Sequence, residues 1–157
     1  MGNFIIKNGN IVNEGRQYVG SLVVTDGIID KIIANDNAFD ASKYSDYETI
    51  DAKGCYVIPG IIDTHVHFRE PGLTHKADIT SESRAAAFGG ITSYFDMPNT
   101  NPQTTTLEAL RGKQELAREK SLVNWAFFPG ATNDNIKVLE SLDASEIPGI
   151  KLFMGIA

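Results

Sequence analysis

Two histidines separated by a single residue, His65 and His67, are the side chains in this chain best suited to chemistry. They follow an apolar run, and Asp63 stands two positions before the first of them. Alternate side chains of a β-strand point to the same face, so we expect these three residues to share one face. Neutral imidazole is the commonest metal ligand, and a nearby carboxylate can orient its ring. The spacing predicts a metal site at a strand end, the alternative being two ordinary surface or core histidines.

A lysine, Lys151, interrupts an apolar segment that runs from Ile150 to Met154. Lysine is almost never fully buried unless its ammonium group is paired. Burial favours the neutral amine, which is nucleophilic. We therefore treat Lys151 as a candidate functional residue, and the alternative is an edge-strand lysine whose amine reaches solvent.

Two polar residues that follow strands, Arg69 and Asn99, are expected to bind substrate. The chain has a formal net charge of −6, so an anionic substrate would need a local cation. The planar guanidinium of Arg69 can pair with a carboxylate through two hydrogen bonds. Asn99 can donate to the same carboxylate and accept from a ring N–H. A solvated arginine and a turn asparagine are the alternatives, but the nearby histidine pair favours binding.

Short strands and turns dominate residues 1–55, which we interpret as part of a small β-sandwich. The dipeptides Asn8-Gly9 and Asp26-Gly27 each stand between apolar segments and predict hairpin turns. Residues 35–46 are polar and predict a loop, after which residues 49–51 return to an extended conformation.

Strands and helices are expected to alternate through residues 56–157. The expected strands are 56–63, 91–95, 121–128 and 147–154. Helices are expected over 79–88 after the cap Asp78, from Thr105 with Glu108 in a capping box, and after the cap Thr132. Four such units indicate an α/β fold with parallel strands. A complete (β/α)₈ barrel needs about 250 residues, so an open four-stranded sheet and the first half of a TIM-type barrel both fit.

Composition narrows the functional classes. A hydrophobic fraction of 42% and a charged fraction of 22% are typical of a globular protein, and no apolar run is long enough for a membrane span. The basic residues are scattered and the net charge is negative, which argues against nucleic-acid binding. A single cysteine, Cys55, and the lack of a secretory signal fit a cytoplasmic protein. We expect a small-molecule substrate.

Two stretches of the sequence, residues 59–72 and 97–102, carry a resemblance to a known family. The segment PGIIDTHVH, from Pro59 to His67, resembles the motif that opens the barrel of the amidohydrolase superfamily. HVHFREPG, which ends at Gly72, and MPNTNP, which begins at Met97, resemble motifs of the dihydroorotases. The chain is therefore similar to the N-terminal portion of a metal-dependent cyclic-amide hydrolase. The resemblance implies part of a small β-sandwich over 1–55 and the first four βα units of the barrel, truncated, over 56–157.

The resemblance also implies an activity and a cofactor. The implied reaction is the reversible opening of L-dihydroorotate to N-carbamoyl-L-aspartate in pyrimidine biosynthesis, with two zinc ions in a complete site. The implied metal ligands are His65, His67 and Lys151, the last as a carbamate that bridges the two ions. Arg69 and Asn99 would hold the substrate carboxylate, with Asp63 behind the ligands.

The resemblance places the general-base aspartate beyond Ala157, so we assign no catalytic residue within the chain. We expect the chain to be truncated and inactive by itself, and a homo-oligomer is left open. Two other functions also stay open. An allantoinase or hydantoinase is one, although such enzymes generally lack an arginine at the position of Arg69. A non-catalytic scaffold built on a degenerate dihydroorotase is the other, although the metal pair, Arg69, Asn99 and Lys151 are all present.

Overall fold

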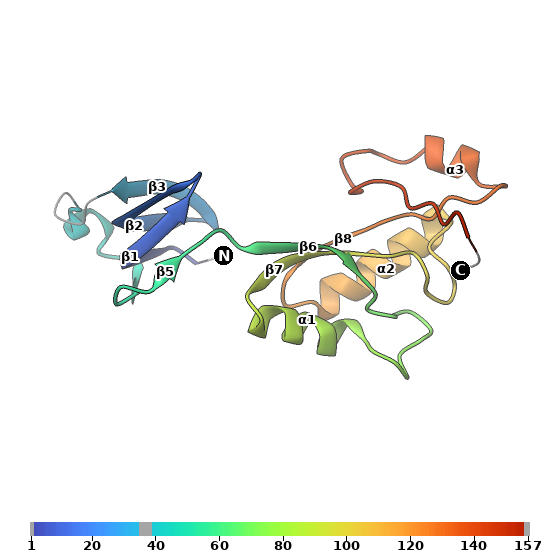
Figure 1. Cartoon of the computed structure of the whole chain (residues 1–157), viewed down its shortest axis with the longest axis horizontal. Coiled ribbons are helices and arrows are strands. Elements are labelled where there is room, and N and C mark those ends of the chain that lie inside the picture. Colours follow the sequence, from blue (N-terminus) through green and yellow to red (C-terminus); the bar gives the residue numbers. More distant parts are fainter. Residues whose placement is uncertain (1, 35–38, 156–157) are drawn as a thin grey trace. The chain divides into compact units, whose positions relative to one another are not determined.

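The computed structural model describes residues 2–34 and 39–155, and the chain divides into two compact units, residues 1–59 and 60–157. Each unit has its own β-sheet, and the helices flank the second sheet (Figure 1). The α/β class expected from the sequence is confirmed. No helix among the described residues is long and apolar enough to cross a bilayer.

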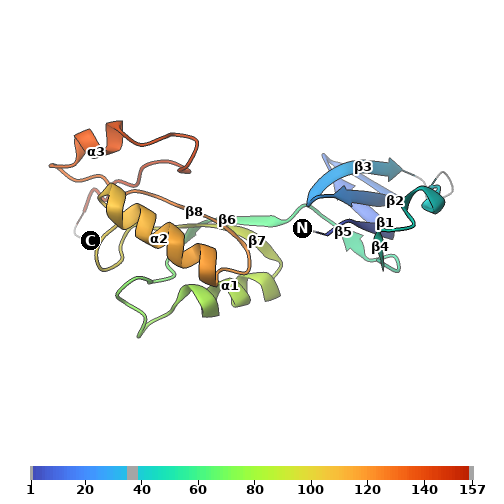
Figure 2. The ribbon, with the colours of Figure 1, turned by 180° about the vertical axis from the view of Figure 1, so that it is seen from behind.

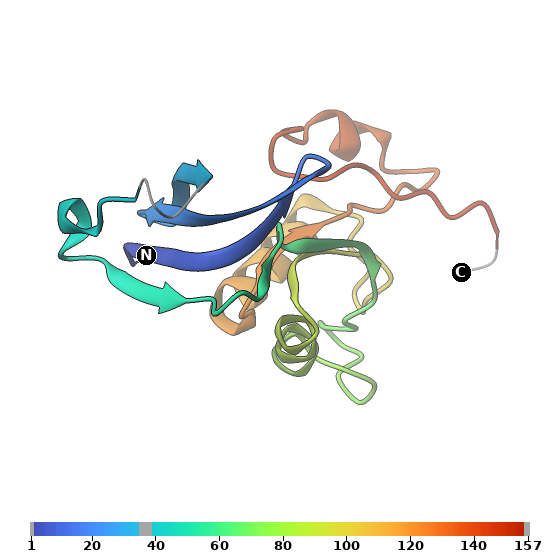
Figure 3. The same ribbon diagram turned by 60° about the vertical axis from the view of Figure 1, so that its left-hand side comes forward.

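A five-stranded mixed sheet forms the first unit. Its strands are β1 (Phe4–Asn13), β2 (Arg16–Thr25), β3 (Ile28–Ala34), β4 (Glu48–Asp51) and β5 (Tyr56–Val57), and a 3₁₀ helix spans Ala41–Tyr44. β1 to β3 pair in antiparallel fashion, whereas β4 and β5 both run parallel to β1. The β1–β2 hairpin, blue in Figure 3, has the usual strand twist. Ile5, Ile11 and Val23 are buried on this sheet.

One of the two predicted hairpin turns is wrong. β1 continues through Asn8-Gly9, where Asn8 has a φ of 57° and the register with β2 shifts between Ile6 and Gly9. Asparagine tolerates the left-handed region, so the dipeptide forms a bulge inside the strand and not a turn. The turn lies at Glu14-Gly15, with φ angles of 49° and 72°. The turn at Asp26-Gly27 is confirmed, with φ angles of 52° and 81°.

Three parallel strands in the order β6-β7-β8 form the sheet of the second unit. The strands are β6 (Ile61–Val66), β7 (Ile91–Asp96) and β8 (Asn124–Phe127). The helices are α1 (Ile79–Phe88), α2 (Leu107–Lys120) and α3 (Ile136–Glu140). α1 links β6 to β7 and α2 links β7 to β8, so two βα units follow one another along the chain (Figure 2).

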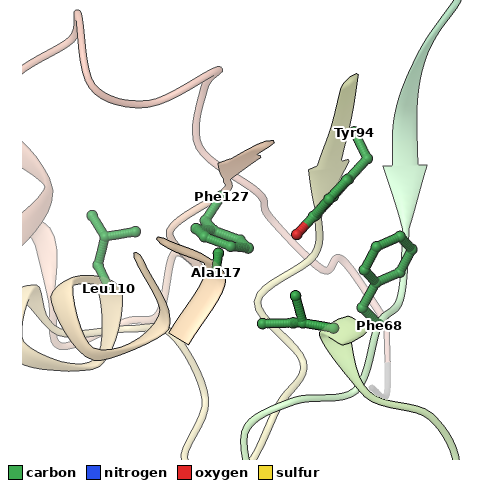
Figure 4. Close-up of a cluster of buried hydrophobic side chains, with 6 residues drawn as sticks. Phe68, Tyr94, Leu110, Ala117 and Phe127 are labelled. Carbon is green, nitrogen blue, oxygen red and sulfur yellow. The ribbon is translucent and has the colours of Figure 1, made fainter. Parts of the chain in front are cut away.

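The hydrophobic core of the second unit lies between the sheet and helices α1 and α2. Figure 4 shows its side chains, which are Phe68, Ile79, Tyr94, Leu110, Ala117 and Phe127. The rings of Phe68 and Tyr94 pack with their centroids 4.2 Å apart. Phe68 is the residue after His67, so the core holds the end of the histidine motif in place.

The fourth predicted strand is much shorter than expected. Within the described part of residues 147–154, only an isolated parallel bridge joins Lys151 to Gly130. Pro129, directly before Gly130, lacks the N–H group that would extend the ladder toward the N-terminus. The predicted cap at Thr132 is also wrong, because α3 begins after Asn135, whose side chain accepts a hydrogen bond from the Thr132 N–H at 2.8 Å.

Helix α1 has the predicted bounds and its predicted cap, Asp78, but α2 begins after Thr106 and not after Thr105. The Thr106 hydroxyl accepts a hydrogen bond from the Ala109 N–H at 3.1 Å. We expect Thr106→Ala to lower the free energy of unfolding by about 1 kcal/mol, measured by urea denaturation. Thr105→Ala is the matched control and should cost clearly less. An equal loss from both substitutions would contradict this assignment of the cap.

Candidate metal and substrate site

The structure places the imidazoles of His65 and His67 side by side at the end of β6. Their ring centroids lie 5.3 Å apart and their planes are inclined by 49°. His65 is exposed and His67 is half-buried. Two imidazoles at this separation can converge on one cation, since each Zn–N bond is about 2.0–2.1 Å long.

The ring of His67 is oriented by Asn99, the asparagine of the loop that follows β7. His67 Nδ1 and Asn99 Oδ1 are 2.7 Å apart. An amide oxygen accepts hydrogen bonds and does not donate, so Nδ1 carries the proton and donates to Asn99. The lone pair then resides on Nε2. Metal-binding histidines usually have this arrangement, in which one ring nitrogen donates a hydrogen bond to the protein and the other nitrogen faces the metal.

Asp63 contacts the main chain of the histidine motif. Its carboxylate accepts a hydrogen bond from the His65 N–H at 3.0 Å. The register between β6 and β7 is irregular between Asp63 and Val66, so the strict alternation expected across the motif is not kept. Asp63 therefore holds the backbone at His65, and within the described residues no contact joins its carboxylate to an imidazole.

Arg69 lies directly after the histidine motif in a left-handed conformation, with a φ of 67°. Its carbonyl oxygen accepts a hydrogen bond from the Leu73 N–H at 3.1 Å, which closes a tight turn. Within residues 2–34 and 39–155, no carboxylate or carbonyl group pairs with the Arg69 guanidinium. The side chain is half-buried, so its planar fork remains available for an anionic ligand.

A hollow of about 200 Å³ borders Asn99. Its lining residues are Pro98, Asn99, Gln103, Thr105, Gly130, Ala131, Thr132, Phe153 and Gly155. The volume corresponds to roughly six or seven water molecules, because a water occupies about 30 Å³ in the liquid. A space of this size can admit a single-ring molecule.

Lys151 reaches the same region through its main chain. Its N–H donates to the Pro129 carbonyl at 2.9 Å, and its own carbonyl accepts from the Ala131 N–H at 2.8 Å. The amine Nζ lies 5.1 Å from the centroid of the Phe153 ring. In the described part of the chain, no hydrogen bond, ion pair or ring contact joins Lys151 to His65 or His67. The structure thus brings the two histidines and Asn99 together and leaves Lys151 outside that contact group.

The donor atoms present fit part of a zinc site. Zinc in proteins commonly takes four ligands, with histidine nitrogen prominent among them, and the histidine pair supplies two. The described residues contain no group of three or more His, Cys, Asp or Glu side chains able to hold a metal ion. Lysine is not one of these four residue types. The Lys151 amine could supply oxygen ligands only as a carbamate, after the addition of carbon dioxide.

Two buried acidic residues that the sequence interpretation left without a site role support the loops. Glu70, only 5% exposed, accepts from the Ile79 N–H at 3.0 Å and forms an ion pair with Lys120. Asp96 is fully buried and accepts from the Phe68 N–H at 2.9 Å. For Asp96 the only sequence signal is a polar residue at the end of an apolar strand.

Burial shifts two pKa values behind the site. Desolvation lowers the pKa of Lys113, a buried lysine on α2, while the nearby charge of Asp96 acts in the opposite direction. Desolvation also raises the pKa of Tyr94 to about 12. Tyr94 therefore stays neutral throughout the physiological range and serves as a core side chain.

Gly72 lets the loop after Arg69 approach the loop after β7. Its φ is +80°, and a Cβ atom built there would lie 1.9 Å from the Asn101 carbonyl oxygen. Gly90 has a similar φ of +83° in the same unit, but a Cβ there would meet nothing within 4 Å. We expect Gly90→Ala to cost about 1–2 kcal/mol, which is the backbone term alone.

Gly72→Ala should exceed that cost by about 1–3 kcal/mol, because backbone must move to admit the methyl group. Urea unfolding of both variants, with the fluorescence of Trp125 in the second unit as the signal, measures the difference. Equal costs would show that the close approach at Gly72 is not required.

Comparison with known proteins shows which family and which curated enzymes this chain resembles. Residues 54–143 match the family model described as dihydro-orotase-like. An allantoinase of Desulfitobacterium hafniense is 39% identical over 150 residues, which are 95% of this chain and 32% of the relative. A dihydroorotase of Methanosarcina mazei is 41% identical over 137 residues, which are 87% of this chain and 29% of the relative. The chain thus spans about a third of the length of these curated relatives.

Solved structures of hydantoinases also match almost the whole of this chain. An L-hydantoinase (dihydropyrimidinase) from Arthrobacter aurescens matches with a TM-score of 0.83 and 32% identity, over 96% of this chain and 32% of that one. A D-hydantoinase from a Bacillus species matches with a TM-score of 0.76 and 31% identity, over 97% of this chain and 32% of that one. These matches confirm the expected fold class, which is part of a β-sandwich followed by the first half of a TIM-type barrel.

Proposed function

Because the chain belongs to the dihydro-orotase-like family of cyclic-amide hydrolases, we propose that it carries the first metal-binding strand and the substrate-binding loops of such a hydrolase. The contact between His67 Nδ1 and Asn99 Oδ1, beside the ring of His65, carries the proposal. This contact leaves Nε2 of His67 free to bind a metal. It also links His67 to the loop of Asn99, which we expect to hold the substrate.

The proposed roles follow from the chemistry of each side chain. His65 and His67 bind zinc, and Asp63 holds the main chain at His65. When bound, zinc lowers the pKa of a coordinated water to near 7 and polarises a carbonyl group. Lys151 would complete the donor set once its ammonium group loses one proton and the neutral amine adds carbon dioxide with loss of a second, which replaces a cation by a carbamate anion with two oxygen donors. We also propose that a complete site holds a second zinc ion, which the Lys151 carbamate would share with the first.

The two parts of the chain receive separate proposed roles. Residues 1–55 contribute to a small β-sandwich, and residues 56–157 supply the first four βα units of the barrel. Active sites of such barrels lie at the C-terminal ends of the strands, where His65, His67 and Asn99 are found. The sequence has a single cysteine, Cys55, which is exposed and, as the only one, has no partner for a disulfide within this chain. This fits the cytoplasmic enzyme with a small-molecule substrate that we propose.

The substrate we favour is L-dihydroorotate, in the direction of N-carbamoyl-L-aspartate or its reverse, as in pyrimidine biosynthesis. Dihydroorotate carries a carboxylate, whereas allantoin and hydantoin carry none. The guanidinium of Arg69, next to the histidine motif and unpaired among the described residues, suits that carboxylate. Allantoin is the second candidate, because the allantoinase of Desulfitobacterium hafniense matches this chain over 95% of its length.

The test uses the expressed gene product that contains this chain, loaded with zinc. Its turnover is compared on dihydroorotate, allantoin and hydantoin. We expect hydrolysis or formation of dihydroorotate to dominate. Turnover of only the uncharged rings would replace dihydroorotase by allantoinase or hydantoinase, and a protein that holds no zinc and turns over none of them would be a scaffold.

Arg69→Lys should lower kcat/KM for dihydroorotate by about 10- to 100-fold. The loss corresponds to one charge-assisted hydrogen bond, because an ammonium group cannot reproduce the two-pronged pairing of a guanidinium. Arg84→Lys, on the exposed face of α1, is the control and should leave kcat/KM unchanged. If the same Arg69 variant also lost activity on the uncharged rings, its role would not be carboxylate binding.

A further inference from the structure

Lys113 is a charged residue in the hydrophobic core of the second unit. It lies in the middle of α2, on the same helix face as Leu110 and Ala117, and its side chain is 0% exposed. An isolated buried ammonium group is strongly unfavourable, so a lysine in this position needs partners. Its partners identify what it does.

Three groups surround the Lys113 amine. Its Nζ lies 2.7 Å from Asp96 Oδ2, in an ion pair whose two side chains are 0% and 1% exposed. The same Nζ donates to the Met97 carbonyl oxygen at 2.8 Å. It also lies 4.9 Å from the centroid of the Phe127 ring, which is a favourable position for a cation. Lys113 thus ties α2 to the end of β7.

The other oxygen of Asp96 extends this tie to the neighbouring strand. Asp96 Oδ1 accepts from the Phe68 N–H at 2.9 Å, and Phe68 directly follows His67. Met97 stands two residues before Asn99, the partner of His67. The Asp96–Lys113 pair therefore contacts the main chain at Phe68, next to His67, and at Met97, two residues before Asn99. Both contacts come from the side of the sheet that α2 covers.

We infer that the buried Asp96–Lys113 pair is a positioning device that fixes the spacing between the end of β6, which carries His67, and the loop after β7, which carries Asn99. Neither residue is a catalytic residue, because both act through the main chain behind the site. The inference rests on the proposed function for the roles of His67 and Asn99.

The alternative is a pair that only stabilises the core. The two cases differ in a double variant, Asp96→Asn with Lys113→Met, which removes both buried charges. The amide oxygen that this variant has in place of the carboxylate can still accept from the Phe68 N–H. The matched control is Leu110→Ala, which damages the same face of α2 about one turn away and leaves both buried charges in place. Both are compared in the gene product that contains this chain.

Three readouts are needed. They are zinc affinity by chelator competition, kcat and KM for the ring substrate, and amide hydrogen exchange at Phe68 and Met97 in the metal-free protein, because these two N–H groups donate to Asp96 and to the Val66 carbonyl. For the double variant we expect zinc affinity to fall by about tenfold or more and exchange at both amides to rise. Leu110→Ala should lose stability and keep its zinc affinity.

Equal zinc affinity and equal exchange in the double variant and in Leu110→Ala would overturn the positioning role. If the unsubstituted protein bound no zinc and turned over no ring, the proposed function would fail. The exchange data on the metal-free protein would still decide whether the pair fixes the two segments.

Discussion

Replacing both histidines of the motif, as His65→Ala with His67→Ala, is expected to abolish zinc binding and to reduce ring hydrolysis by at least about 10³-fold. The two imidazoles are adjacent, with ring centroids 5.3 Å apart, and no other described histidine lies with them. Without them the bound metal would be lost, and with it the lowering of the pKa of a coordinated water to near 7. Metal content by elemental analysis and turnover of the zinc-loaded gene product measure the two effects.

The chain offers a matched control in its third histidine, His75, which is exposed and matches neither motif. His75→Ala should leave zinc content and turnover at the unsubstituted values. Retention of stoichiometric zinc in the double variant, or an equal loss in His75→Ala, would mean that the metal is held elsewhere.

The single substitution Lys113→Met is expected to lower the free energy of unfolding by about 3–5 kcal/mol. Methionine fills a similar volume, so the cost comes from the Asp96 carboxylate, which would be left buried and without its ion-pair partner. Urea denaturation at neutral pH measures the loss. Adding Asp96→Asn removes the stranded charge and should restore much of the stability.

Lys120→Met is the comparison for this loss. Lys120 also pairs with a buried carboxylate, Glu70, but its side chain is 35% exposed, so water can replace part of the interaction. A loss from Lys113→Met no greater than that from Lys120→Met would show that the Asp96–Lys113 pair is not desolvated in solution.

Local signals in the sequence predicted the elements that depend on few residues. Helix α1 begins after Asp78 because the Asp78 carboxylate accepts a hydrogen bond from the Ser81 N–H, and Gly89 follows its last residue. Asp26-Gly27 forms its turn because both residues reach positive φ. The rings of His65 and His67 also lie together, as their spacing predicts, although β6 ends between them at Val66.

Features that depend on distant partners were not predictable in the same way. Asn8-Gly9 resembles a turn locally, but pairing of β1 with β2 on both sides of it makes it a bulge. The fourth strand is reduced to a single bridge, and Pro129, without an N–H group, cannot donate the next ladder bond on its N-terminal side. The contact of Asn99 with His67 joins residues 32 positions apart, and only the folded chain brings them together.

The buried pair behind the site shows the same limit. Lys113 lies at the helical spacing of Leu110 and Ala117, which marks it as core-facing, yet a lysine at such a position is usually taken for a solvated residue. Its partners, Asp96 and the Met97 carbonyl, come from the end of β7, which a loop separates from α2. The fold therefore assigns Lys113 a role that its local sequence does not.

Whether His65 and His67 hold one zinc ion is tested most directly by zinc-edge anomalous diffraction from crystals of the zinc-loaded gene product. We expect a zinc peak about 2.0–2.1 Å from one ring nitrogen of His65 and one of His67, with His67 Nδ1 still hydrogen-bonded to Asn99 Oδ1. A peak located away from these two rings, or no peak at stoichiometric zinc, would contradict the proposed site.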